Sequence, residues 1–220
     1  MAKKKRVDPS DFDDSCRRLM PGGVGPVFIE LRRNAIVLQA LRELLFELYG
    51  SVEVAQLLDY TSPYFFAAVR DAFLRELLTS LARFTDAAAS GGGPSRENLS
   101  LPRLLRELEA AGAVDFANTI RPRVATITRT AGAVRALRNK VLAHSDLQTA
   151  LGTSPQPLPT TTRRQAESLI DRITRLLNKV ELRYRKSATM YGNSIASGAT
   201  SSLLRALEQS RQADEELRRQ

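Results

Sequence analysis

The sequence predicts an all-α protein, a helical bundle of about five to seven helices. Apolar residues recur at spacings of three and four along most of the chain, which is the periodicity of a buried helix face. No stretch shows the strict alternation that indicates a strand. With 43% hydrophobic residues in a chain of 220, the protein can bury a substantial core. We expect a flexible arm over residues 1–24, the bundle over 25–186, and an extension with a helix over 187–220.

Two long helices are expected to open the bundle. The first covers residues 27–49, where an unbroken apolar stripe ends before a glycine. The second begins at Thr61 or Ser62 as the cap, with Pro63 in its first turn. Its stripe continues to about residue 84 and is rich in phenylalanine, and we interpret this aromatic face as core.

The middle of the chain predicts two more helices. A Gly-Gly-Gly-Pro run at 91–94 indicates a flexible connection, after which Ser100 caps a short helix that ends near Ala111. A long helix is then expected from Pro122 to about Ala143. A stretch rich in proline and glycine follows it and cannot continue a helix.

Positive charge is concentrated in one part of the chain. Residues 121–186 carry fourteen basic and four acidic side chains, whereas the other stretches are balanced to within one charge, so the net charge of +9 arises here. Within this region Thr162 caps a helix whose polar face is crowded with arginines. Such an excess attracts polyanions and predicts salt-dependent binding of nucleic acid.

The composition argues against metal catalysis and against a membrane protein. Cys16 and His144 are the only cysteine and the only histidine, so clustered Cys and His ligands cannot form, and we expect no metal and no cofactor. No window approaches the roughly 18 consecutive apolar residues of a membrane span. The basic residues at 3–6 are followed by acidic residues rather than by the apolar stretch of a signal peptide. We therefore expect a soluble, cytoplasmic protein.

The stretch 134–146 holds the candidate active site. Arg138, Asn139 and Lys140 are adjacent there, and His144 follows them near the end of a helical segment. A histidine side chain with an ordinary pKa of about 6.5 exchanges protons near neutral pH, and a planar guanidinium binds and neutralises phosphate. Phosphodiester cleavage needs both proton transfer and stabilisation of charge.

The spacing of the motif constrains how its residues can meet. On one uninterrupted helix, Arg138 and His144 would lie about 120° apart around the axis and about 9 Å apart along it, so they would not face the same point. Either the helix bends or ends before His144, or groups from another helix or a second subunit complete the site. A symmetric dimer would place two copies of the motif across a two-fold axis.

The segment 138–144 resembles the signature of the HEPN superfamily, an arginine, usually followed by a polar residue, and then a histidine after four to six intervening positions. Here five positions intervene, and Asn139 takes the polar place. The context is similar to the abortive-infection AbiU-type branch of HEPN proteins. That context is the helix end at 78–86, the Gly-rich loop, and the opening of the next helix at 97–101. The resemblance covers roughly residues 27–186.

The resemblance implies a HEPN-type bundle that forms a homodimer through the helix carrying the motif and cleaves RNA without a metal. In HEPN ribonucleases the RNA 2′-hydroxyl is thought to be the nucleophile, leaving a cyclic phosphate and a 5′-hydroxyl. On the matching positions, Arg138 would hold the scissile phosphate, His144 would be the general acid or base, and Asn139 would orient the phosphate or the histidine. The implied setting is phage defence or a toxin, with RNA and an antitoxin or regulatory protein as partners.

Other polar residues are candidates for supporting roles. Lys140, Arg135 and Arg83 are predicted to contact RNA phosphates. Arg83 and Asp86 are both candidates for the site, although Arg83 can equally pair with Asp86 three residues later on the helix. Asp146 either orients the histidine or makes a turn after the helix.

Two other classes of function stay open at this point. The first is a HEPN-like module that binds RNA or nucleotide without cutting it. The second is a helical adaptor or DNA-binding oligomer in which Arg138 and His144 only pack. Cleavage of RNA in excess chelator supports an enzyme, binding without cleavage supports the first alternative, and affinity that does not change with salt supports the second.

Overall fold

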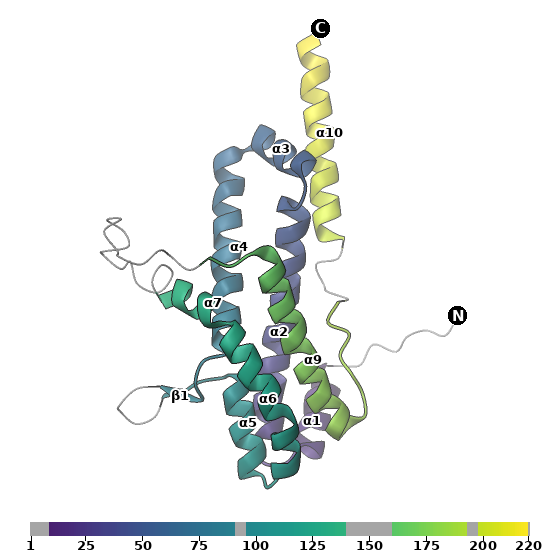
Figure 1. Ribbon diagram of the computed structural model, residues 1–220. Helices are drawn as coiled ribbons and strands as arrows, with labels where there is room; N and C mark the ends of the chain where they lie inside the picture. Colours follow the sequence, from purple (N-terminus) through teal and green to yellow (C-terminus); the bar gives the residue numbers. More distant parts are fainter. Residues whose placement is uncertain (1–8, 91–95, 140–159, 193–197, 220) are drawn as a thin grey trace, which may run out of the picture.

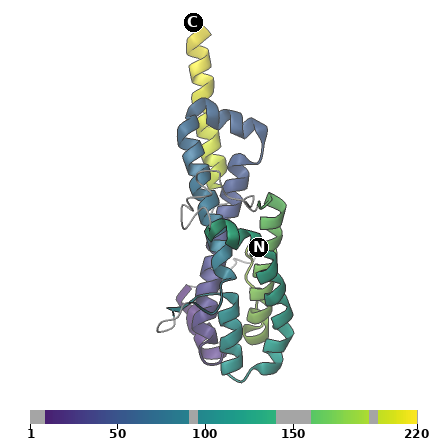
Figure 2. The ribbon, with the colours of Figure 1, turned by 60° about the vertical axis from the view of Figure 1, so that its left-hand side comes forward.

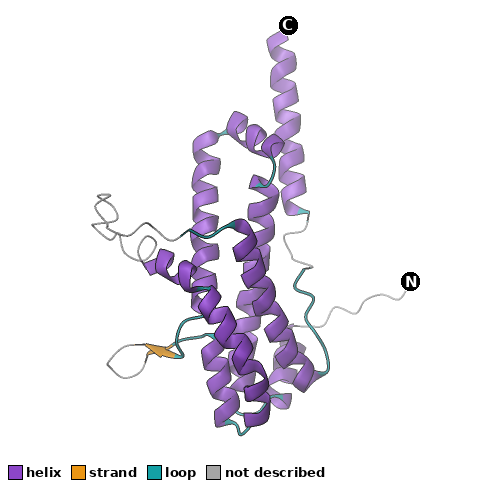
Figure 3. Cartoon of the chain, viewed as in Figure 1, coloured by secondary structure: helices purple, strands orange, loops and turns teal. Residues whose placement is uncertain are grey.

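The computed structural model describes residues 9–90, 96–139, 160–192 and 198–219, and these form nine α-helices and one short β-ladder (Figure 1, Figure 3). The predicted all-α bundle is confirmed. None of these helices has the length and apolar character needed to cross a membrane. The helices are α1 (Pro9–Leu19), α2 (Val24–Tyr49), α3 (Val52–Thr61), α4 (Pro63–Phe84), α5 (Leu101–Ala110), α6 (Val114–Thr130), α7 (Gly132–Leu137), α9 (Arg163–Arg185) and α10 (Ala199–Arg219).

Helix α2 is the central helix of the fold. It packs against α1, α4, α5 and α9, and it therefore buries side chains on several faces (Figure 1). The helix predicted for residues 27–49 is confirmed and begins three residues earlier, at Val24. The largest fully buried side chains of the main core are Phe28, Ile29, Leu31, Leu38, Leu81, Leu101, Leu104, Leu108, Ile120, Ile127 and Leu169.

Side-chain caps fix where two of the helices begin. The Ser100 hydroxyl accepts a hydrogen bond from the Arg103 backbone N–H at 3.3 Å at the start of α5. At the start of α9, the Thr162 hydroxyl accepts the Gln165 N–H at 3.2 Å, and the Gln165 side chain accepts the Thr162 N–H at 2.9 Å. Both predicted caps are confirmed, and the second is a complete capping box.

The prediction that a long helix starts at Pro122 is wrong. Helix α6 begins at Val114, and Pro122 lies inside it. Proline lacks an N–H and leaves the Asn118 carbonyl without its helical donor, but both residues are exposed, so water can replace that donor. A break at Ala131 divides the remaining turns into α6 and α7, and the predicted end near Ala143 lies outside the described residues.

Residues 9–19 form helix α1, which buries one face, so the prediction of a flexible arm is wrong for them. Helix α1 packs against α2 and α9, and Phe12, Cys16 and Met20 lie in the main core. Phe12, Cys16 and Met20 are four apart, which places them on one side of α1 and of the residue that follows it. Burial raises the pKa of the Cys16 thiol to about 11. Residues 1–8 lie outside the described part of the chain.

A buried carboxylate joins the end of α9 to the segment that follows it. The Glu181 side chain is 2% exposed and forms an ion pair with Arg185, whose Nη1 donates to Glu181 Oε1 at 2.9 Å. The hydroxyls of Ser187 and Thr189 donate to the same carboxylate at 2.9 and 2.7 Å. All of these donors satisfy a charge that would otherwise be costly to bury.

The same cluster holds α1 against the bundle. The Phe12 ring lies between the guanidinium groups of Arg32 and Arg185, which are 3.7 and 3.8 Å from the ring centre. Arg32 Nε also donates to the Thr189 hydroxyl at 2.8 Å. One aromatic side chain of α1 is thus held by cations from α2 and α9.

Helix α10 takes part in a second, smaller core. Leu48, Leu58 and Phe66 form its centre, and Leu204 and Leu207 of α10 pack against them. The helix predicted in the extension is therefore present, and its first half packs against α3 and α2. The end of α10 projects beyond α3 in both views (Figure 1, Figure 2).

The connection between α4 and α5 contains the only strands among the described residues. Strand β1 (Ala89–Ser90) pairs with β2 (Arg96–Glu97) in an antiparallel ladder. The sequence predicts no strand, and a two-residue ladder is too short to produce a periodic pattern. The glycine run predicted to be a flexible connection lies within 91–95, outside the described residues.

Candidate functional site

The motif begins at the end of α7. Helix α7 packs against α4, and burial of Val134 in the main core fixes its position. Arg138 and Asn139 follow in a wider, π-type turn, with Arg138 partly buried and Asn139 exposed. Turns of this type recur at functional sites because they change the direction in which side chains point.

Asp86 holds the guanidinium of Arg138. Arg138 Nη1 donates to Asp86 Oδ2 at 2.7 Å, and Arg138 Nε donates to Asn139 Oδ1 at 3.0 Å. The side chains of Arg138 and Asp86 are 20% and 24% exposed, so the ion pair is shielded but still reaches solvent. A guanidinium held at two nitrogens is already oriented, and it loses less conformational freedom when it binds an anion.

Arg135 attaches the same helix to the end of α4. Its Nη1 donates to the Thr85 carbonyl at 2.8 Å. Thr85 is the buried C-cap of α4, where carbonyls lack helical donors and a positive charge is favourable. Arg135 therefore stabilises the packing of α7 on α4, and its role in RNA binding stays a prediction.

Arg83 of α4 lines a cavity shared with α2. Its Nη1 is 3.6 Å from Glu76 Oε1, and both residues line a small cavity of about 90 Å³ between α2 and α4. The pairing of Arg83 with Asp86 that the sequence allows is wrong, because Asp86 pairs with Arg138 instead.

Three of the predicted site residues lie outside the part of the chain that the structure describes. These are Lys140, His144 and Asp146. The structure thus brings together Arg138, Asn139 and Asp86, with Arg135 one turn earlier. The catalytic role of His144 stays a prediction.

In the described part of the motif, the Arg138 guanidinium has a donor that suits an anion. Arg138 uses Nε and Nη1 in the contacts above, and among the described residues Nη2 has no hydrogen-bond partner. A phosphate oxygen could accept a charge-assisted hydrogen bond there. In the described ranges, no group of three or more His, Cys, Asp or Glu side chains is arranged to hold a metal ion.

Asp86 is a candidate from the sequence, but its contact with Arg138 is not predicted there. It lies 52 positions before Arg138, and no periodicity connects two residues so far apart. One signal was present in the sequence. A carboxylate just after the C-terminus of a long helix is electrostatically unfavourable, so Asp86 needed a cationic partner from elsewhere.

The all-α bundle agrees with the HEPN-type fold that the 138–144 motif predicts. Residues 24–209 match the family model HEPN AbiU2, described as AbiU2. Because the match spans most of the chain, the chain belongs to the AbiU2 family and is an abortive-infection HEPN-type protein. The matched region extends past the predicted 27–186 into α10. Neither a curated protein nor a solved structure matches the chain.

Proposed function

We propose that the protein is a metal-independent endoribonuclease of abortive infection, with Arg138, Asn139 and His144 as its catalytic residues. The proposal rests on the orientation and the exposure of the Arg138 guanidinium. Its guanidinium is oriented by Asp86 and Asn139, partly exposed, and has one terminal nitrogen without a partner among the described residues. A fixed cation of this kind stabilises charge that develops on a phosphate in the transition state.

The proposed reaction needs one attack and two proton transfers. The RNA 2′-oxygen attacks the phosphorus and loses its proton to a general base, while the 5′-oxygen leaves and takes a proton from a general acid. Arg138 neutralises the non-bridging oxygens, and His144 exchanges a proton near neutral pH. Asn139 accepts from Arg138 through Oδ1, which leaves its amide nitrogen to orient the phosphate or the histidine.

The proposal includes a homodimer. His144 is the sixth residue after Arg138, a spacing that places them on different faces of a continuous helix. A second subunit supplies the missing geometry by placing another copy of the motif across a two-fold axis. An antitoxin or regulatory protein is a further proposed partner.

The wild-type protein is expected to cleave RNA in excess EDTA and to leave DNA of the same sequence intact. DNA lacks the 2′-hydroxyl, so the proposed attack cannot take place on it. Gel electrophoresis of the products and analysis of their ends measure this, with a cyclic phosphate and a 5′-hydroxyl expected. Cleavage of both polymers, or RNA cleavage that stops when EDTA is added, contradicts the proposal.

A second candidate is a HEPN-type module that binds RNA without cutting it. Arg138 already has a carboxylate partner, and this ion pair also joins α7 to α4. In that case, RNA binds with salt-dependent affinity and stays intact under the same conditions.

A further inference from the structure

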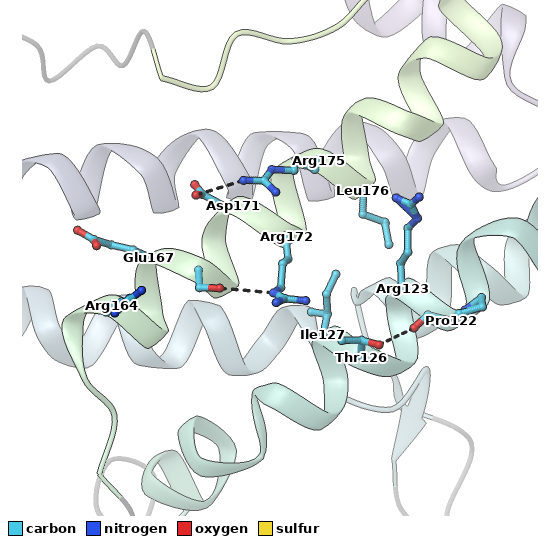
Figure 4. Close-up of a pocket in the computed structure, with 11 residues that line it drawn as sticks. Pro122, Arg123, Thr126, Ile127, Arg164, Glu167, Asp171, Arg172, Arg175 and Leu176 are labelled. Atoms are coloured by element: carbon cyan, nitrogen blue, oxygen red, sulfur yellow. Dashed lines mark hydrogen bonds and ion pairs between the residues drawn. The ribbon is translucent and has the colours of Figure 1, made fainter.

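A groove of about 680 Å³ lies between α6 and α9 (Figure 4). Its floor is formed by two buried apolar side chains, Ile127 of α6 and Leu176 of α9. Arginines dominate the rest of its lining, and no lysine is among them: Arg123, Arg164, Arg172 and Arg175. Guanidinium groups suit phosphate, because they form two parallel hydrogen bonds with it.

The two carboxylates of the groove already have arginine partners. Glu167 pairs with Arg163 at 3.0 Å. Asp171 Oδ1 lies 3.6 Å from Arg42 Nη1, and Asp171 Oδ2 lies 3.7 Å from Arg175 Nη2. These contacts neutralise the acidic side chains, so the remaining arginines determine the charge of the groove.

Three arginines keep their charge unpaired within the described residues. Arg123, Arg164 and Arg172 have no ion pair there, and the hydrogen bond of Arg172 is to the Ser168 hydroxyl at 3.4 Å. Figure 4 shows Arg172 and Arg123 extending from opposite helices into the space between them. Arg164 and Arg172 are two turns apart on α9, about 12 Å along the axis, which is longer than one phosphate group.

The groove lies between the two helices that flank the motif in the sequence. Helix α6 continues through the break at Ala131 into α7, which leads to Arg138. Helix α9 starts at Arg163, shortly after the segment 140–159 that contains His144. The groove is therefore formed by the helices that lead into and out of the segment carrying the motif.

We propose that the groove between α6 and α9 binds the sugar-phosphate backbone of the single-stranded RNA substrate, through Arg123, Arg164 and Arg172. The identity of the ligand rests on the proposed function. The separation of Arg164 and Arg172 along α9 lets them contact different phosphates of one strand. The three arginines are binding residues, and the chemical step stays with the motif.

The test compares two triple variants that remove the same charge. One replaces Arg123, Arg164 and Arg172 with alanine. The control replaces Arg205, Arg218 and Arg219 of α10, which are also exposed and have no ion pair among the described residues. Binding of a 2′-O-methyl RNA, which cannot be cleaved by attack of the 2′-oxygen, is measured by fluorescence anisotropy at several salt concentrations. Circular dichroism verifies that both variants fold. If the alanine variant of the groove does not fold, a variant with glutamine at the same three positions replaces it.

The groove variant is expected to bind at least about tenfold more weakly, with the slope of log affinity against log salt reduced by about 2. The control is expected to bind as the wild type does. Equal affinities and equal slopes in the two variants would overturn the proposal. Because the RNA analogue is not cut, loss of binding in the groove variant supports the groove even if the protein cleaves no RNA. If it does cleave, KM is expected to rise while kcat is unchanged.

Discussion

Replacing Arg138 with alanine is expected to slow RNA cleavage by about 100-fold or more, because it removes the cation that stabilises the transition-state phosphate. Arg138→Lys keeps the charge but loses the planar group that contacts Asp86 and Asn139, so only partial activity is expected. Single-turnover cleavage at saturating enzyme measures the chemical step for both variants.

Arg70→Ala is the matched control for this prediction. Arg70 is also an arginine with an adjacent carboxylate partner, Asp71 at 3.4 Å, but it lies on the exposed surface of α4. Its loss is expected to leave the rate unchanged. If Arg138→Ala cleaves at the wild-type rate and only unfolds more easily, the ion pair with Asp86 is purely structural.

Replacing Glu181 with alanine is expected to lower the free energy of unfolding by about 3–5 kcal/mol. The change leaves Arg185 partly buried without its carboxylate and removes the acceptor of two hydroxyls, Ser187 and Thr189. It also weakens the cluster that holds Phe12 of α1. Urea denaturation followed by circular dichroism measures the effect.

Glu215→Ala provides the comparison on the surface. Glu215 pairs with Arg211 on α10 at 2.8 Å, and both side chains are more than one third exposed, so the expected loss is below about 1 kcal/mol. Equal destabilisation by the two substitutions would show that the buried cluster contributes no more than an exposed ion pair.

Local patterns predicted the helices that bury a long apolar stripe. Helices α2, α4 and α9 follow from their periodicity, and Ser100 and Thr162 cap helices as predicted because capping depends on residues within one turn. The helices that were not predicted include α1 and α3. Both are short, and packing against other segments stabilises them.

The candidate site was predicted in composition but not in arrangement. The motif at 138–144 and the positive charge of 121–186 are visible in the sequence. The partner of Arg138 is Asp86 rather than a neighbour on the same helix, since the packing of α7 on α4 brings them together. The groove required α6 and α9 to lie side by side, which helical periodicity alone cannot show.

Cleavage of RNA by His144→Ala in excess chelator, relative to the wild type at the same concentration, tests the proposed ribonuclease most directly. The proposal predicts a loss of about 100-fold to 10,000-fold, because the variant lacks the group that transfers protons. Binding of the uncleavable RNA is expected to remain, since the groove arginines are unchanged. Cleavage by His144→Ala at the wild-type rate would contradict the proposal.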